Sequence, residues 1–211
     1  MTVALDPPIV LHPKRSLVRH VQSILLQPRA DWPIIAAEPA TTTGLYLGYI
    51  GPLAAIPPAA ALIGRTVLGI GMPFGGTYRV PFGSALISAL VQYVVALVGV
   101  YGLALIIDGL APAFGGARGR VQALKVAAYA STASWIAGIV GLVPALGILG
   151  LVGIYSLYLI YLGLPAVMKA PPERAVGYAA TVIACAIGLF LVTGAIASRF
   201  IAYPVLSLPV R

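Results

Sequence analysis

Groups that could carry acid–base or metal chemistry are scarce in this sequence. Its 211 residues include five Asp or Glu, two His and one Cys. His12 and His20 lie eight positions apart, without the i, i+4 spacing of a helical zinc pair. An aspartyl intramembrane protease would need a second carboxylate opposite Asp108. The residues therefore predict a protein that is not an enzyme and that holds no metal or cofactor.

Asp108 is the one carboxylate that we place within reach of a bilayer core. An intramembrane carboxylate is costly and is by default a functional candidate. However, it stands just before residues 109–112, where Gly109 and Pro112 favour the end of a helix. The interpretation that we prefer is a carboxylate at the cytoplasmic boundary, reached by water or by Arg118 or Arg120.

The loop 115–120 sets Arg118 and Arg120 among three glycines. Backbone N–H groups and two guanidinium groups in such a loop could hold a phosphate or an anionic lipid headgroup. The plainer alternative, which we favour, is a flexible basic loop that fixes membrane topology.

Tyr155, Tyr158 and Tyr161 recur every third residue, which places three hydroxyls along one side of a helix. Helix packing with interhelical hydrogen bonds explains them most simply. The alternative is a polar stripe that lines a path for a solute.

Small residues and prolines also recur inside the apolar runs. Small residues allow two membrane helices to approach closely, and the candidates for such packing are Gly44, Gly48, Gly147, Gly150 and Gly153. Proline removes a backbone donor and kinks a helix, and the candidates for kinks are Pro52, Pro57 and Pro58. A broken helix is a common place for a membrane protein to bind or move something.

The elements that must position these residues are membrane helices. The chain is 60% hydrophobic and only 9% charged, against about 25% charged residues in an ordinary soluble domain. About 20 apolar residues in a helix cross a hydrocarbon core. The run 126–168 has 43 uncharged residues and must fold back, and we place its turn at 141–147. Five spans follow, at about 44–64, 84–108, 122–142, 147–168 and 176–198.

The sequence thus predicts an all-α integral membrane protein, a bundle of five transmembrane helices preceded by a short amphipathic interfacial helix. We divide the chain into a disordered tail (1–15), a cytoplasmic amphipathic segment (16–40), the transmembrane domain (41–200) and a short C-terminal tail (201–211). Apolar residues recur at helical spacing from Leu17 to Leu25. Trp32 is expected to anchor this segment at the headgroup boundary. The alternative is that the helix packs on the protein's own cytoplasmic loops.

Basic residues predict the orientation of the chain. With a cytoplasmic N-terminus, nine of the 13 Lys and Arg, Lys125 among them, lie on the inner side, and four lie outside. The positive-inside rule therefore favours a cytoplasmic N-terminus and an outer C-terminus. The net charge of +8 is scattered between apolar runs rather than gathered on one face, which argues against nucleic acid as a partner.

Several segments resemble the Yip family, and its bacterial members in particular. They are residues 28–32, 35–39, 45–52, 144–150, 155–164 and 175–178. The resemblance covers roughly residues 20–198 and consists of hydrophobic patterning with scattered Gly, Pro and Tyr. It implies a five-span protein with a cytoplasmic N-terminus, placed here in a bacterial inner membrane. Eukaryotic relatives are associated with Rab-type GTPases and vesicle traffic.

These observations lead to two functional hypotheses. The first is a non-enzymatic scaffold or adaptor whose partners are membrane lipids and either another protein or a second copy of the chain. The second is a transporter or channel for a small solute, suggested by the kinked first span, Asp108 and the tyrosines. Against the second stands the lack of an obvious internal repeat, which many transporters have.

Overall fold

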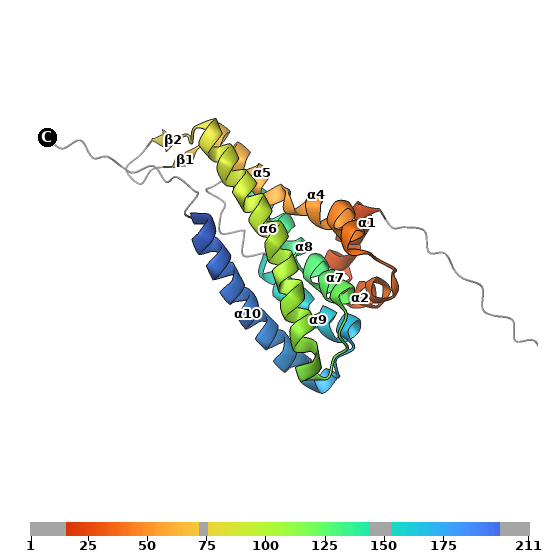
Figure 1. Cartoon of the computed structure of the whole chain (residues 1–211). Helices are drawn as coiled ribbons and strands as arrows, with labels where there is room; N and C mark the ends of the chain where they lie inside the picture. Colours follow the sequence, from red (N-terminus) through yellow and green to blue (C-terminus); the bar gives the residue numbers. More distant parts are fainter. Residues whose placement is uncertain (1–15, 72–75, 144–152, 199–211) are drawn as a thin grey trace, which may run out of the picture.

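The computed structural model describes residues 16–71, 76–143 and 153–198 (Figure 1). Helices α1 (Leu17–Leu26) and α2 (Pro28–Ala37) form a pair before the first span. The first span then runs through α3 (Thr42–Leu45), the π-helical turn η1 (Tyr46–Ile50), α4 (Gly51–Ala54), α5 (Ile56–Ile63) and the π-helical turn η2 (Gly64–Leu68). Strands β1 (Ile70–Gly71) and β2 (Thr77–Tyr78) pair antiparallel beyond it.

The rest of the chain contains the longest helices. These are α6 (Phe82–Leu110) with the 3₁₀ turn η3 (Ala111–Phe114), then α7 (Arg120–Ala130), α8 (Thr132–Ala137) and the 3₁₀ turn η4 (Gly138–Leu142), and finally α9 (Tyr155–Met168) and α10 (Pro172–Ser198). The fold is therefore all-α, as the sequence predicts.

In the described part of the chain, four stretches are long and apolar enough to cross a bilayer: Thr42–Leu68, Phe82–Phe114, Arg120–Leu142 and Pro172–Ala195. They coincide with the first, second, third and fifth predicted spans. The fourth predicted span is described only from residue 153, and its helix α9 has 14 residues. At 1.5 Å per residue, α9 is about 21 Å long, short of the roughly 30 Å core. Residues 144–147 of the predicted hairpin lie outside the described part.

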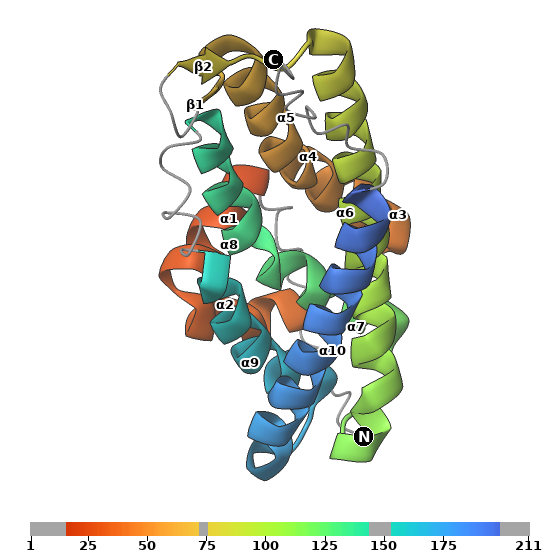
Figure 2. The same ribbon diagram turned by 90° about the vertical axis from the view of Figure 1, so that its left-hand side faces the viewer.

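The third span lies at the centre of the bundle. In it, 67% of the most apolar stretch is buried, compared with 17% in the second span and 22% in the last. Helix α7 packs between α6 and α9, and α10 packs along α6. Helices α1 and α2 lie on the side of the bundle away from α10 (Figures 1 and 2). The outer faces of α6 and α10, rich in exposed Leu, Ile and Val, are the surfaces suited to lipid.

The first span is interrupted where its prolines occur. The π-helical turn η1 immediately precedes Pro52, and the break between α4 and α5 falls at Ala55, just before Pro57 and Pro58. A proline cannot donate to the carbonyl four residues earlier, so such a helix bends or changes its hydrogen-bond register. The two halves of this span can therefore contact different neighbours. Helix α5 packs on η4 and α6.

Helix α1 packs on the protein instead of lying freely at an interface. Ser16 caps it by accepting a hydrogen bond from the Arg19 N–H. Ile24 is fully buried, and Leu17, Val21 and Leu25 pack against the core. The apolar face of α1 thus covers the third and fourth spans. This arrangement differs from the alternative expectation, in which the helix packs on the protein's own cytoplasmic loops. The predicted tails, residues 1–15 and 201–211, lie outside the described part.

Candidate functional site

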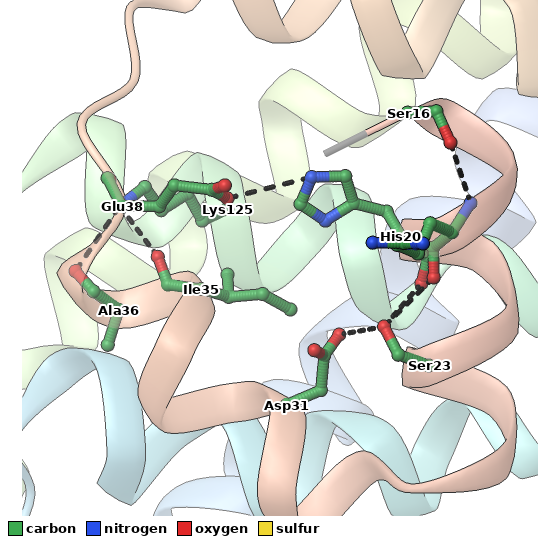
Figure 3. Close-up of polar contacts among 9 residues, drawn as sticks. Ser16, His20, Ser23, Asp31, Ile35, Ala36, Glu38 and Lys125 are labelled. Atoms are coloured by element: carbon green, nitrogen blue, oxygen red, sulfur yellow. Dashed lines mark hydrogen bonds and ion pairs between the residues drawn. The ribbon is translucent and has the colours of Figure 1, made fainter. Parts of the chain in front are cut away.

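The main polar cluster of the described chain lies where α2 meets the third span. It consists of His20 and Ser23 from α1, Asp31 and Glu38 from α2 and its C-cap, and Lys125 from α7 (Figure 3). We call these five residues the N-terminal clamp. The clamp joins three helices, the neighbouring α1 and α2 and the distant α7.

Lys125 is the centre of the clamp. Its side chain is 2% exposed, and its ammonium group donates to the Ile35 carbonyl at 2.9 Å and the Ala36 carbonyl at 3.3 Å. It also donates to the Glu38 carbonyl. The last carbonyls of a helix have no intrahelical donor, and the helix dipole makes this end negative. The buried cation therefore completes the C-terminus of α2.

The other members of the clamp join α1 to α2. The Ser23 hydroxyl lies 2.8 Å from the Asp31 carboxylate, whose side chain is buried. His20 Nε2 lies 3.7 Å from the Glu38 carboxylate, and His20 Nδ1 is buried with no partner in the described part of the chain. Both acids of the segment thus face inward. The buried Asp31 carboxylate accepts a hydrogen bond from Ser23, whereas the Glu38 side chain is 25% exposed.

An aromatic layer covers the inner side of the clamp. Tyr129 contacts the rings of His20, Trp32 and Tyr49, with the Tyr49 centroid 4.4 Å away. The Tyr49 hydroxyl lies 2.6 Å from the Thr132 hydroxyl, and both residues are buried. The layer connects the first span, the third span and the N-terminal helices, so the clamp is part of the bundle core.

Trp32 does not have the exposed ring expected of an interfacial anchor. Its side chain is 1% exposed and lies in the core of the bundle. Gly163 of α9 makes room for the indole, since a Cβ there would lie 2.7 Å from Trp32 Cζ2. The sequence pattern suggested an interfacial anchor because it could not show that a glycine from a distant helix opens a pocket for the ring.

Asp108 lies at the end of α6 and is half-buried. Its carboxylate accepts a hydrogen bond from the Gly119 N–H at 2.7 Å, which ties the 115–119 loop to the helix. Arg118 and Arg120 are exposed, and among the described contacts neither pairs with Asp108. The carboxylate therefore holds the loop through its backbone.

The three tyrosines of α9 do not share one environment. Tyr155 donates to the Leu25 carbonyl of α1 at 3.2 Å. Tyr158 stacks obliquely on Tyr155 but is 37% exposed, and Tyr161 is 39% exposed. Two of the three side chains therefore point outward instead of toward a path through the bundle.

The glycines differ in the same way. Gly153 lies against Ser134 of α8, where a Cβ would be 3.4 Å from the hydroxyl. Gly48 is exposed with no atom within 4 Å of such a Cβ, and Gly44 would meet only the nearby Thr41 side chain. Within the described ranges, no other helix therefore makes the predicted close approach at Gly44 and Gly48. Gly147 and Gly150 lie outside the described residues.

Sequence reasoning missed the clamp. It counted Lys125 only among the basic residues of the cytoplasmic side, because the uncharged run begins at the next residue, whereas the structure buries this side chain. A signal was present: Lys125 has an apolar residue on either side, Leu124 and Val126, and a charge at such a position calls for a partner.

Acid–base groups gather in the clamp, but the described residues contain no group of three metal-binding side chains. The lysine and the acids are bound to the chain's own atoms, so the arrangement fastens helices together. The model of the Yip1 domain matches residues 23–193, which include every clamp residue except His20 and nearly all of the four long apolar stretches of the described chain. The chain belongs to the Yip family. A search of curated proteins and a search of solved structures found no significant match.

Membership in the Yip family agrees with the apolar helices of the structure. The family consists of non-catalytic membrane proteins, and the chain is an integral, multipass membrane protein. The match begins within α1, at residue 23, so the family pattern includes most of the N-terminal pair of helices. Four of the five clamp residues therefore lie within the matched range, and His20 lies three residues before it.

Proposed function

We propose that this Yip-family protein is a membrane scaffold or adaptor that acts through lateral contacts in membrane trafficking or organisation. We place it in the bacterial inner membrane, with the N-terminus in the cytoplasm and the C-terminus outside. Its partners are lipids and either another membrane protein or a second copy of the chain. It acts without catalysis.

One observation carries the proposal: several buried polar side chains that join different helices bind the chain's own groups. Lys125 binds the end of α2, the Tyr49 and Thr132 hydroxyls bind each other, and the Tyr178 hydroxyl donates to the Ile107 carbonyl. Polar groups of a transport path must instead remain available to a passing solute. Here the buried polar groups stabilise the packing of the helix bundle, and the outer faces of the bundle are left to contact lipids and other proteins.

Gly48 offers a direct test, because among the described residues no atom lies within 4 Å of a Cβ placed there. The open space beside Gly48 suits close approach by a helix of another chain. Gly48→Leu should therefore leave the fold intact but weaken a lateral contact. Gly99→Leu on α6 is the matched control, since that glycine is equally open.

The readouts are complementation of a strain lacking the gene and crosslinking from exposed Leu47. We expect Gly48→Leu to lose both a discrete crosslinked product and complementation, and Gly99→Leu to keep both. The scaffold proposal fails if Gly48→Leu behaves like Gly99→Leu in both assays.

A transporter or channel for a small solute is the second candidate, favoured by the interrupted first span. Uptake into liposomes that contain the purified chain distinguishes the two. Solute uptake that Asp108→Asn or Tyr158→Phe abolishes would support transport and oppose the scaffold.

A further inference from the structure

An open groove lies between the α1–α2 turn and α9. Residues 26–30 form one wall, and Tyr155 and Tyr158 form the other. The groove has a volume of about 410 Å³, within the range of small-molecule sites in proteins. Its lining combines apolar side chains, a cation, a side-chain amide and two phenols.

Two polar groups of this groove are available to a ligand. Arg29 is exposed and makes no ion pair or side-chain hydrogen bond with the described residues. Tyr158 contacts the Tyr155 ring, and its own hydroxyl has no partner among them. A guanidinium group binds a phosphate through two parallel hydrogen bonds, and a phenol can donate a third.

The charges of the α1–α2 pair are segregated. Asp31 and Glu38 face inward to the clamp, whereas Arg19 and Arg29 are exposed on the outer side. The outward face therefore presents positive charge without nearby exposed acids. Leu26 is 79% exposed beside Arg29 in the groove wall. A cation next to an exposed aliphatic side chain matches a molecule with an anionic head and an apolar tail.

We propose that this groove holds the headgroup of an anionic phospholipid, with Arg29 and Tyr158 on the phosphate and Leu26 against the first part of an acyl chain. The occupant is a lipid because the chain is a membrane protein and because apolar and cationic groups lie side by side in the groove. The positive end of the α2 dipole, which begins at Pro28, adds to the attraction.

The test uses the purified full-length chain in a neutral detergent. Native mass spectrometry measures the affinity for dioctanoyl phosphatidylglycerol and for dioctanoyl phosphatidylcholine. We expect phosphatidylglycerol to bind about tenfold more tightly. Arg29→Gln should lower this affinity about tenfold and Tyr158→Phe about threefold, because each removes a donor to the phosphate.

Arg19→Gln is the matched control, since it removes the same charge from the same face outside the groove. It should change the affinity less than about twofold. Melting temperatures measured without lipid establish that each variant is folded. If Arg29→Gln does not fold, the lipid affinities of two other variants are compared with the control. These are Tyr158→Phe and Arg29→Lys, the second of which keeps the charge.

Three results would overturn the proposal. The first is equal affinity for the two lipids, and the second is equal loss in Arg29→Gln and Arg19→Gln. The third is displacement of phosphatidylglycerol by an equal concentration of glycerol 3-phosphate, which would mean a site for a soluble phosphate. Loss that is confined to the groove variants supports the lipid site.

Discussion

Replacing Lys125 with Met tests whether the buried cation holds the N-terminal helices on the bundle. Met keeps most of the length of the side chain but cannot donate a hydrogen bond. The change leaves three carbonyls at the end of α2 without their donor and removes the only Lys or Arg side chain of the clamp. The groups left behind are largely buried.

The size of the effect follows from those contacts. A hydrogen bond to a charged group contributes about 1.5–3 kcal/mol, and breaking a buried ionic contact from one side costs about 3–5 kcal/mol. The carbonyls can recover part of this by reaching water as α2 loosens. We therefore expect the free energy needed to detach α1 and α2 from the bundle to fall by about 3 kcal/mol. This corresponds to a roughly hundredfold larger detached population.

Limited trypsin digestion measures that population. Arg19 and Arg29 lie within α1 and α2, so cleavage after them requires local unfolding. When closing is faster than cleavage, the rate follows the population of the open form. Lys125→Met should be cut at these sites about a hundredfold faster than the original protein.

Lys169→Met is the control, because Lys169 is exposed and has no role in the clamp. Surface substitutions usually change stability by less than about 0.5 kcal/mol, so cleavage should remain within about twofold. Equal cleavage of the Lys125→Met and Lys169→Met variants would refute the clamp, since the buried contacts would then contribute nothing to holding α1 and α2.

Four further outcomes follow from the structure and the sequence. Tyr49→Phe should lower the free energy of unfolding by about 1–2 kcal/mol, because it leaves the buried Thr132 hydroxyl unpaired. Chemical unfolding in detergent measures this loss. The double variant with Thr132→Val should lose less than the sum of the two single changes. Gly163→Ala should cost about 1–3 kcal/mol in the same assay because the new methyl group meets the Trp32 ring, and an unchanged midpoint would contradict that packing. Asp108→Asn keeps an acceptor oxygen for the loop and should cost less than about 1.5 kcal/mol; a loss of about 3 kcal/mol or more would indicate a partnered core carboxylate. Reporters fused to the C-terminus should be active only outside the cytoplasm, because the basic residues favour that orientation, and activity inside would require an even number of spans.

The linear pattern of charge and hydrophobicity was enough to predict the long helices. Apolar runs without charges must be helical in a bilayer, since lipid cannot satisfy backbone groups. For this reason Phe82–Phe114 and Arg120–Leu142 lie where the sequence placed them. The break before Pro57 is local as well, because a missing backbone donor acts within one helical turn.

The site depended on contacts between residues far apart in the chain. Lys125 and Glu38 are 87 positions apart, and no periodicity within either segment shows that the end of α2 lies over α7. Trp32 likewise became a core residue because Gly163 leaves space for it. The sequence alone determined which segments are helical and apolar. Only the tertiary structure decided which polar side chains they bury together, because burial depends on which other helix covers each face.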